Sequence, residues 1–447
     1  MTETPTYDEM KNPYFMKAVN GKKVSVIGAC GRIGLPLTYI IAKSGYMVTA
    51  IDLNKDIPRW VTADDTPFPY IEDGFRDLGS DYGFRWKTIY RERVTFTDTY
   101  DSLADSDYIV VIVGTPVDGE NNPRVENIIE LFDKHIIPVL RDGQTIILRS
   151  TVFPGMTDLL EERIFDARTN FHEVPDYSLV FAPERVSQGH SLEETTKLPQ
   201  LIGSYNTKSA NRAEEFFKSL NVSKVKHMLP LEAEYGKLIT NMYRYVNIAF
   251  ANEVYMMTAN KAVNIHKVIE AANADYPRMD MPRPGPNAAG PCLFKDGKLL
   301  VDDTPYGDLV NVAFHINEGM PKFVFNLTKD FAYEHNLPLK KVAILGMTFK
   351  RNIDDIRFSE SYKLKKILIR NGIEVVEYDE YLGKTNVEEV DAVIVMTPHD
   401  GFTAVIKEFL DASKHEIIVA DAWGHSGLSW HGNTFNGIYK VSKNSWL

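Results

Sequence analysis

A pattern of three short apolar segments near the start of the chain occurs a second time near its end. The segments are residues 23–28, 46–52 and 107–116 in the first copy and 341–346, 373–379 and 391–398 in the second. Such near-continuous runs of Val, Ile and other apolar residues are typical of strands buried on both faces of a parallel sheet. Helical patterns between them, at 35–44 and 359–370, predict strand–helix–strand alternation. The fold class is therefore expected to be α/β, with one doubly wound sheet at each end of the chain.

The middle of the chain has a different pattern, with helical periodicity from about 231 to 263. Within that stretch apolar residues recur at helical spacing, no Pro occurs, and no Gly follows Gly236. A helix of about 30 residues is roughly 45 Å long, and such helices commonly bridge domains or form a subunit interface. The Pro-, Gly- and Asn-rich segment 275–291 is expected to be a loop. We expect two Rossmann-like domains joined by a long central helix in an all-α middle domain.

Composition excludes several classes of protein. The 447 residues carry a formal charge of −11, which argues against nucleic acid as the main partner because phosphate binding needs a basic surface. No run approaches 18 consecutive apolar residues, so no membrane span is expected. Two cysteines exclude a disulfide framework and a four-cysteine zinc site, and no metal is expected. Residues 1–20 lack the apolar core of a signal peptide, which favours a cytoplasmic location.

The first turn of the first copy is rich in glycine. It reads Gly28-Ala-Cys-Gly31-Arg32-Ile33-Gly34, one residue longer than the usual G-x-G-x-x-G spacing. Glycines between a strand and a helix let backbone N–H groups approach a pyrophosphate. Asp52 ends the next strand, and a carboxylate there accepts ribose hydroxyls and repels a 2′-phosphate, which favours NAD over NADP. The alternative is a glycine turn with a helix-capping acid.

The two cysteines lie in different contexts. Cys30 is inside the glycine turn, where a small loop residue is the simplest interpretation. Cys292 follows the Pro/Gly loop, with Lys295 and Asp296 three and four residues later. A thiol has an ordinary pKa near 8.5 that nearby cations lower, so Cys292 is a candidate nucleophile. The alternative for Cys292 is a buried small hydrophobic residue.

Further polar residues stand at positions where ligands commonly bind. Lys237 and Asn241 form an i, i+4 pair on the expected long helix and share one face. Glu184 follows the strand-like run 177–181, and Thr151 follows the run 145–148. In doubly wound sheets, ligands bind beyond the carboxyl ends of the strands. Each of these residues also has a plain structural interpretation, as a solvated or neutral polar side chain.

The corresponding turn of the second copy, from Gly346 to Lys350, lacks the G-x-G pattern. It remains able to hold a phosphate through backbone N–H groups and Lys350, and Arg357 lies shortly downstream. A second nucleotide-like site fits a nucleotide-linked substrate. The alternative is a degenerate duplicate that only supports the fold.

Taken together, these motifs resemble the UDP-glucose/GDP-mannose dehydrogenase family over residues 23–402, nearly the whole chain. The matching residues are Gly290-Pro-Cys292 with Asp296, Lys237 with Asn241, Ser150 to Gly155, Pro183-Glu184, and Gly346, Phe349, Lys350, Asp355 and Arg357. Members of this family use NAD to oxidise nucleotide sugars at C6 to uronic acids. The resemblance implies an NAD-binding domain at 1–225, a central helical dimerisation domain with the cysteine at 226–336, and a nucleotide-sugar-binding domain at 337–447.

Three departures from the family pattern are visible. The family's double glycine before the cysteine is Ala289-Gly290, and the glycine turn carries its extra residue. In the UDP-glucose branch an acid follows the Pro-Glu glutamate by four residues, whereas this chain has Gln188. The segments 183–189 and 397–399 look more like the branch that acts on UDP-N-acetylhexosamines. A UDP-N-acetylhexosamine is therefore the favoured substrate, with UDP-glucose as the alternative.

The resemblance also implies roles for individual residues. Cys292 attacks the aldehyde, Lys237 stabilises the oxyanion, Asn241 and Asp296 hold a water that accepts the C6 hydroxyl proton, and Glu184 and Thr151 serve the hydrolytic water. The implied cofactor contacts are Gly28, Gly31, Arg32, Ile33, Gly34, Asp52, Thr115, Thr151, Lys295 and Arg357. The implied substrate contacts are Glu184, Arg185, Lys237, Asn241, Arg278, Phe349 and Lys350. A homodimer through the central helix is implied as well.

Two other functions stay open at this point. Single-step NAD dehydrogenases of hydroxy acids also use a Lys and an Asn on a central helix but need no cysteine. They form one NADH per substrate, whereas alcohol-to-acid oxidation forms two. A non-catalytic dinucleotide-binding protein is the third possibility, and it predicts binding without turnover.

Overall fold

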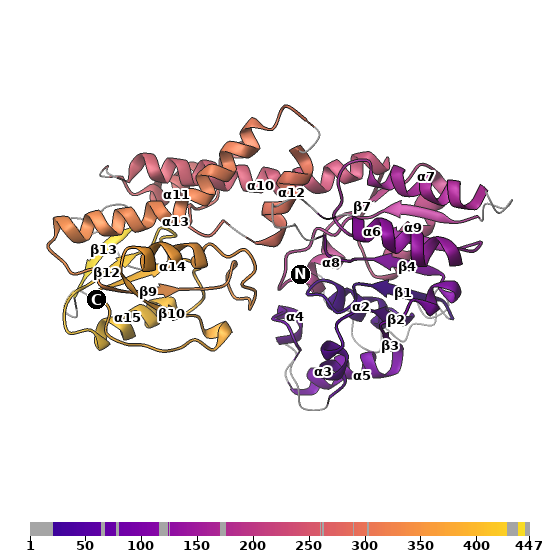
Figure 1. The fold of residues 1–447 in the computed structure, drawn as a ribbon, viewed down its shortest axis with the longest axis horizontal. Helices are drawn as coiled ribbons and strands as arrows, with labels where there is room; N and C mark the ends of the chain where they lie inside the picture. Colours follow the sequence, from indigo (N-terminus) through magenta and orange to yellow (C-terminus); the bar gives the residue numbers. More distant parts are fainter. Residues whose placement is uncertain are drawn as a thin grey trace. The chain divides into compact units, whose positions relative to one another are not determined.

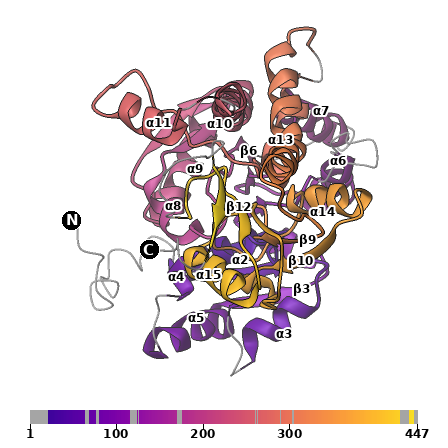
Figure 2. The ribbon, with the colours of Figure 1, turned by 90° about the vertical axis from the view of Figure 1, so that its left-hand side faces the viewer.

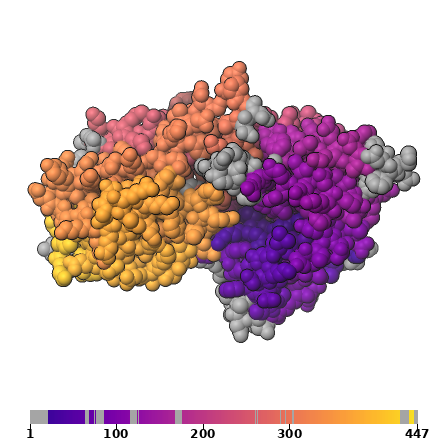
Figure 3. All heavy atoms as spheres, in the orientation of Figure 1, coloured from indigo at the N-terminus to yellow at the C-terminus, as the bar shows by residue number. Residues whose placement is uncertain are grey.

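The computed structural model describes residues 21–63, 68–76, 80–115, 124, 126–169, 176–259, 261, 263–288, 290–301, 304–426 and 437–442. Residues 1–20, Pro116 and Ala289, which entered the interpretation above, lie outside the described residues. The chain divides into two compact units. The first comprises Met1–Ile239 with Lys298–Leu300, and the second comprises Thr240–Gly297 with Val301–Leu447. Figure 1 shows the ribbon, and Figure 3 shows all heavy atoms in the same orientation, with side chains filling the space between the ribbon elements of each unit.

The first unit is built on one sheet (Figure 1), whose order among the described residues is β3-β2-β1-β4-β5-β6-β7-β8. The strands are β1 Lys23–Ile27, β2 Met47–Ile51, β3 Val94–Thr97, β4 Tyr108–Val111, β5 Thr145–Leu148, β6 Ser178–Phe181, β7 Gln200–Gly203 and β8 Val225–Met228. Neighbouring strands are parallel except β6 and β7. The chain order reverses between β1 and β4, so the carboxyl ends of these two strands form the edge at which such sheets bind ligands.

Helices cover both faces of this sheet. They are α2 Gly34–Lys43, α3 Asp56–Thr62, α4 Asp73–Arg76, α5 Ser80–Arg93, α6 Glu126–Leu131, α7 Met156–Thr169, α8 Ser191–Lys197 and α9 Thr207–Ser219, with short η2 Asp101–Asp105, η3 Phe132–Ile136 and η4 Ile137–Val139. Successive residues of β4 show the alternation: Val110 packs in the core with α2, α5 and α9, whereas Ile109 and Val111 pack in the core with α6 and α7. Both faces are therefore apolar, as the near-continuous apolar runs predict.

The second unit contains the remaining helices and a second sheet. The helices are α10 Pro230–Thr258, whose first residues belong to the first unit, α11 Ile265–Asn273, α12 Pro291–Val301, α13 Asp308–Glu334, α14 Ser361–Arg370 and α15 Phe402–Ala412. The strands are β9 Lys341–Leu345, β10 Glu374–Tyr378, β11 Ala392–Val395, β12 Ile417–Ala420 and β13 Ile438–Val441, with the short η5 at Glu380–Leu382. Within the described residues the sheet order is β10-β9-β11-β12-β13. Helices α13 and α14 lie on one face of this sheet and α15 lies on the other (Figure 2).

The predicted α/β fold class, with two sheets and a helical region between them, is confirmed. The long helix ends at Thr258 rather than near 263, and Asn264 caps the next helix by accepting a hydrogen bond from the N–H of Lys267. The sheets are mixed rather than purely parallel, since β6–β7 and β12–β13 are antiparallel pairs. In the part of the chain that the structure describes, no helix combines the length and apolarity needed to cross a bilayer.

Two glycines provide a test of the packing at the first turn. A Cβ at Gly34 would lie 2.1 Å from the carbonyl oxygen of Gly28, so Gly34→Ala forces the turn open. We expect it to lower the free energy of unfolding by about 1–3 kcal/mol. Gly319, inside α13, has no heavy atom within 4 Å of the place that a Cβ would occupy, so Gly319→Ala is the control and should stabilise by roughly 1 kcal/mol. Urea denaturation measures both, and equal effects of the two variants would contradict this account.

Candidate active site

The glycine turn of the first unit brings backbone rather than side chains to the ligand-binding edge of the sheet. Gly28 has a φ of +90°, and a Cβ there would lie 2.8 Å from the carbonyl oxygen of Ile112. Asp52, at the end of β2, accepts hydrogen bonds from the N–H groups of Cys30 (2.8 Å) and Asn54 (2.9 Å). Each carboxylate oxygen keeps further lone pairs for ribose hydroxyls. The turn therefore fits a dinucleotide, with its pyrophosphate at the N-terminus of α2.

Arg32 and Tyr70 pack over this turn. The Arg32 guanidinium lies 4.8 Å from the centroid of the Tyr70 ring, and the Tyr70 hydroxyl donates to the carbonyl of Cys30 at 2.6 Å. Cys30 itself is buried, and burial followed by the nearby Asp52 raises the pKa of its thiol to about 12. Ile33 precedes the first residue of α2. Cys30 is thus a packed loop residue whose thiol stays protonated at neutral pH.

Two further loops at the carboxyl ends of the strands are tied together. The Thr115 hydroxyl donates to the carbonyl of Thr151 at 3.0 Å, and the Ser150 hydroxyl donates to the carbonyl of Val113 at 2.8 Å. Thr115 and Ser150 are both buried. The loops after β4 and β5, which contain Thr115 and Thr151, therefore form one hydrogen-bonded structure within the first unit.

Glu234 connects the Thr151 loop to the start of α10. Its buried carboxylate accepts hydrogen bonds from the N–H groups of Gly155 (2.6 Å) and Thr157 (2.9 Å), at the N-terminus of α7. Burial raises the pKa of Glu234, while these hydrogen bonds act to lower it. Lys237, also buried, follows Glu234 by three residues on the same helix. The contact thus fixes the stretch of α10 that carries Lys237 against the loop that carries Thr151.

Glu184 forms a buried ion pair. One carboxylate oxygen contacts the guanidinium of Arg149, and the other accepts from the N–H groups of Arg185 (2.9 Å) and Val186 (3.0 Å). Burial acts to raise the pKa of Glu184, but Arg149 and the two N–H groups hold it below its usual value. The Arg185 guanidinium donates to the carbonyl of Pro199. Glu184 is therefore an ionised hydrogen-bond acceptor at neutral pH.

In the second unit, Cys292 stands beside a buried polar pair. Cys292 is exposed on the first turn of α12, one turn before Asp296, which is fully buried. The side-chain amide of Asn241 donates to Asp296 at 2.6 Å, and Lys295 Nζ lies 3.7 Å from the other Asp296 oxygen. Helix α10 places Lys237 one turn before Asn241. The structure therefore brings Asn241, Lys295 and Asp296 together next to an accessible thiol.

Four further residues singled out from the sequence, Phe349, Lys350, Arg357 and Arg278, lie on loops of the second unit. A Cβ at Gly290, whose φ is +105°, would lie 2.6 Å from the Phe349 ring, so this ring packs directly on the backbone before Cys292. Lys350 follows Phe349 and is half-buried. Arg357 pairs with the buried carboxylate of Asp355, with Nη2 at 2.6 Å. Arg278 instead lies on the ring of Tyr276, 4.5 Å from its centroid.

The turn after β9 repeats the geometry of the first unit but uses its acid differently. Gly346 has a φ of +86°, and Asp379 accepts from the N–H groups of Met347 (2.7 Å) and Thr348 (3.1 Å). His399 Nε2 lies 3.2 Å from the same Asp379 oxygen. Burial acts to raise the pKa of Asp379, but His399 and the two N–H groups hold it below its usual value. Asp379 is fully buried, so it has no exposed side-chain surface to offer a ribose.

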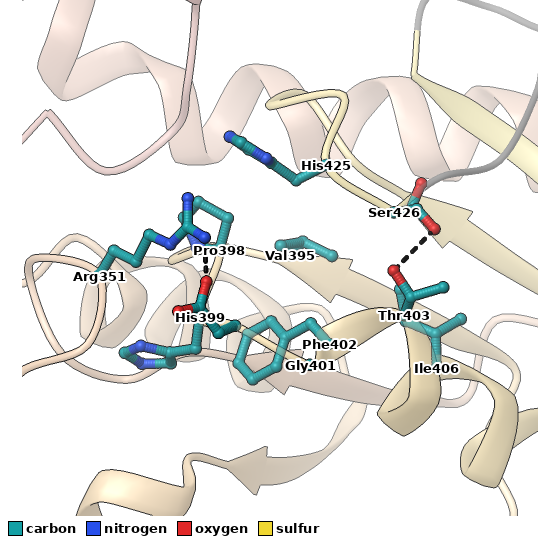
Figure 4. Close-up of a pocket in the computed structure, with 11 residues that line it drawn as sticks. Arg351, Val395, Pro398, His399, Gly401, Phe402, Thr403, Ile406, His425 and Ser426 are labelled. Atoms are coloured by element: carbon teal, nitrogen blue, oxygen red, sulfur yellow. Dashed lines mark hydrogen bonds and ion pairs between the residues drawn. The ribbon is translucent and has the colours of Figure 1, made fainter.

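A hollow of about 410 Å³, including space open to solvent, adjoins this turn (Figure 4). It lies where the loops after β9, β11 and β12 meet, and an ion pair between Arg351 and Asp400 crosses its rim. Its lining residues are Arg351, Val395, Pro398, His399, Asp400, Gly401, Phe402, Thr403, Ile406, His425 and Ser426. Among the described residues, no group of three His, Cys, Asp or Glu side chains is placed to hold a metal ion.

Comparison with known proteins decides the family. Three models of the UDP-glucose/GDP-mannose dehydrogenase family match, for the NAD binding domain at 22–221, the central domain at 231–317 and the UDP binding domain at 343–425. The chain belongs to this family. It is an NAD-dependent nucleotide-sugar dehydrogenase, as the sequence motifs predict, and the glycine turn with Asp52 fits its NAD.

The similar proteins include enzymes named for one sugar. The UDP-N-acetyl-D-mannosamine dehydrogenase of Pyrococcus horikoshii is 31% identical over 411 residues, covering 89% of this chain and 94% of that protein. The enzyme of the same name from Methanocaldococcus jannaschii is 30% identical, covering 87% and 88%. The solved structure of the P. horikoshii enzyme has a TM-score of 0.80 at 30% identity, covering 93% of this chain and 98% of that one. The native structure of the Staphylococcus aureus UDP-N-acetyl-mannosamine dehydrogenase has a TM-score of 0.78 at 27% identity, covering 93% and 98%.

Several residues that organise the site were not predicted from the sequence. Arg149, Glu234 and Asn287 act through contacts with residues 35 to 110 positions away. Arg149 precedes the Ser-Thr motif, and Glu234 precedes Lys237 by three residues, so proximity to a motif was the available signal for both. Nothing in the local pattern around Asn287 marks it as special.

The different environments of the two cysteines give a direct test. Iodoacetamide at neutral pH should modify Cys292 at least about tenfold faster than Cys30, because alkylation needs an accessible thiolate. Peptide mass spectrometry resolves the two sites. In concentrated guanidinium chloride the two rates should converge, which serves as the control. Equal rates in the folded protein would show that Cys30 is not packed as described.

Proposed function

We propose that this enzyme oxidises UDP-N-acetyl-D-mannosamine at C6 to the corresponding uronic acid. The proposal depends most on one observation: Cys292 is exposed one turn before the buried Asp296, which Asn241 contacts at 2.6 Å. The names of the similar proteins support the sugar. Gln188, at the position where the UDP-glucose branch has an acid, supports an N-acetylated sugar over glucose. The matched UDP binding domain supports the uridine diphosphate part.

The first oxidation needs a proton acceptor at the C6 hydroxyl. We assign this role to a water held by Asn241 and Asp296, because the buried carboxylate keeps acceptor capacity beyond its contacts with Asn241 and Lys295. Lys237 supplies a positive charge for the developing oxyanion. When bound, NAD supplies the hydride acceptor for each of the two oxidations.

The second oxidation uses the thiol. Cys292 Sγ forms a bond to C6 of the aldehyde, and the aldehyde oxygen takes up a proton, giving a thiohemiacetal. Loss of a second hydride and of the hydroxyl proton gives a thioester. A water then attacks the thioester carbonyl, the C–S bond breaks, and the thiolate and the carboxylic acid are released. Glu184 and Thr151 orient this water, and an ionised Glu184 suits hydrogen-bond acceptance from it.

The remaining assignments follow the same scheme. We assign NAD binding to residues 1–225, the dimerisation helix and thiol to 226–336, and nucleotide-sugar binding to 337–447. The cofactor contacts proposed are Gly28, Gly31, Arg32, Ile33, Gly34, Asp52, Thr115, Thr151, Lys295 and Arg357. The substrate contacts proposed are Glu184, Arg185, Lys237, Asn241, Arg278, Phe349 and Lys350. Arg357 is held by Asp355, and Arg278 rests on Tyr276, so each presents its guanidinium in a defined direction.

Counting NADH tests the activity and the mechanism together. The enzyme is incubated with NAD and UDP-N-acetylmannosamine, UDP-N-acetylglucosamine, UDP-N-acetylgalactosamine, UDP-glucose or GDP-mannose, with absorbance at 340 nm as the readout. We expect the highest kcat/KM with UDP-N-acetylmannosamine and two NADH per substrate. Cys292→Ala should lower acid formation at least about 10³-fold, as loss of a covalent nucleophile does. Cys30→Ala is the matched control and should keep turnover.

Other outcomes would contradict the proposal in distinct ways. One NADH per substrate with Cys292→Ala unaffected indicates a single-step dehydrogenase. A preference for UDP-glucose refutes the sugar assignment and leaves the mechanism in place. Binding of NAD without turnover of any nucleotide sugar indicates a non-catalytic protein.

We also propose a homodimer through α10. Tyr243, Val246, Phe250 and Met257 lie on this helix at spacings of three, four and seven residues. Such spacing places side chains along one stripe that a second helix can cover. Tyr243, Phe250 and Met257 expose 69%, 53% and 63% of their surface. Exposure of several large apolar side chains along one stripe is typical of an interaction surface. A second copy of the same stripe is the occupant that matches it in length and polarity.

A charge in the stripe should separate the subunits. Phe250→Glu is expected to convert a dimer into a monomer, because two carboxylates would have to lie against apolar side chains at the interface. Light scattering coupled to size-exclusion chromatography measures the mass. Tyr333→Glu, at an 85% exposed position near the end of α13, is the control and should leave the mass unchanged. A wild-type enzyme that runs as a monomer would refute the dimer.

A further inference from the structure

Asn287 joins four separate segments of the second unit. It lies in the loop before α12, five residues before Cys292, and it is buried. Its side-chain nitrogen lies 2.9 Å from the carbonyl oxygen of Thr348 and 2.7 Å from the hydroxyl of Thr397. Its side-chain oxygen accepts from the N–H of Glu360 at 2.9 Å. The turn after β9, the end of β11 and the start of α14 therefore all meet at this amide.

The hydrogen-bond pattern fixes the orientation of the amide. The Glu360 N–H can only donate, so the atom facing it is the side-chain oxygen of Asn287. The nearest acceptors of the nitrogen are the Thr397 hydroxyl and the Thr348 carbonyl, at 2.7 and 2.9 Å, and the hydroxyls of Ser359 and Ser361 follow at 3.2 and 3.5 Å. The Thr397 hydroxyl in turn donates to the same Thr348 carbonyl at 2.6 Å, which closes a three-membered ring of hydrogen bonds. A side chain without both donors and an acceptor cannot reproduce this arrangement.

This amide links the turn that carries Phe349 to the loop that carries the thiol. Thr348 precedes Phe349, whose ring packs on the backbone of Gly290, two residues before Cys292. Asn252 of α10 holds the earlier part of the same loop by accepting from the N–H of Gly285 at 2.8 Å. Asn287 thus forms hydrogen bonds between the loop and the turn, whereas Asn252 forms one between the loop and α10.

We propose that Asn287 is a positioning residue that fixes the Cys292 loop to the nucleotide-binding turn, so that UDP bound at the turn changes the accessibility of the thiol. The inference rests on the proposed function, because it takes Phe349 and Lys350 as nucleotide contacts. Asn287 touches no reacting atom itself. It acts by making Cys292 and the turn one rigid structure, within which the sugar carbon that follows the diphosphate meets Sγ at a fixed place.

The variants separate positioning from stability. Asn287→Ala removes all the contacts, whereas Thr397→Val keeps the shape of residue 397 and removes the hydroxyl at 2.7 Å. Thr397→Ser restores a hydroxyl and should rescue. Asn273→Ala is the matched control. The Asn273 side chain forms hydrogen bonds with the N–H and the carbonyl of Met281, which lies in the loop before α12 and does not contact the turn after β9 through these bonds. If Asn287→Ala fails to fold, the comparison of Thr397→Val with Thr397→Ser provides the test.

Two readouts are taken on the full-length enzyme. The first readout is the rate at which iodoacetamide alkylates Cys292 without UDP, divided by the rate with saturating UDP. This measurement needs no turnover. We expect UDP to slow alkylation about tenfold in the wild type, in Thr397→Ser and in Asn273→Ala. The ratio should fall towards one in Asn287→Ala and Thr397→Val, although UDP still binds by calorimetry. The second readout is kcat for acid formation, which should fall about tenfold in the same two variants, the loss expected for one buried hydrogen-bonded contact.

The outcomes distinguish this inference from the proposed function. A wild-type ratio near one, or a wild-type ratio retained in Asn287→Ala and Thr397→Val, overturns the inference even if UDP-N-acetylmannosamine is oxidised. The same loss in Asn273→Ala also overturns it, because the effect would then be general loosening of the loop. If the expected ratios are found but no nucleotide sugar is oxidised, the proposed function fails and the link between turn and thiol stands.

Discussion

Both sheets depend on one backbone constraint, a glycine with positive φ directly after the first strand. Gly28 and Gly346 turn the chain so tightly that a Cβ would meet a neighbouring carbonyl group, Ile112 in one case and Thr397 in the other. In both, the N–H of the glycine donates to the last residue of the next strand, at 2.9 Å. The turn is thereby tied to the strand that ends in the acidic residue. The first residue of each turn is thus held by a main-chain hydrogen bond, and the residues that follow it are held by the carboxylate.

The two copies differ in what the acidic residue does next. Asp52 is half-buried and receives only backbone N–H groups among its described hydrogen bonds, so carboxylate surface remains for a ribose. Asp379 is fully buried and contacts His399, whose Nδ1 accepts from the N–H of Asn352 at 2.9 Å. Because Nδ1 accepts this hydrogen bond, Nε2 is the ring nitrogen that donates towards Asp379. The carboxylate beside the first turn therefore keeps surface for a ribose, whereas the carboxylate beside the second turn is buried and only holds that turn in place.

The sequence predicts what repeats locally and misses what depends on distant partners. The segments at 23–28, 46–52 and 341–346 correspond to β1, β2 and β9 because buried parallel strands are apolar throughout, a pattern visible in any short window. Strands β3, β7, β8, β12 and β13 were not predicted. His227 and Lys440 interrupt the apolar pattern of β8 and β13. The pairing of Arg149 with Glu184 and the contacts of Asn287 were missed for another reason. They join residues far apart in the chain, so no short window of the sequence contains both partners.

The chemistry of the two cysteines shows how far environment, rather than residue type, determines function. Cys30 follows a strand and precedes a helix, a place where a thiol at a helix N-terminus commonly has a lowered pKa. Here burial and Asp52 outweigh that effect and raise the pKa to about 12. Burial, with a smaller contribution from Asp52, therefore keeps the Cys30 thiol protonated at neutral pH. Cys292 lies instead at the start of α12 with an exposed side chain and Lys295 three residues later. The same residue type therefore occurs in two different environments in this chain, one that keeps a thiol protonated and one that leaves it accessible to solvent.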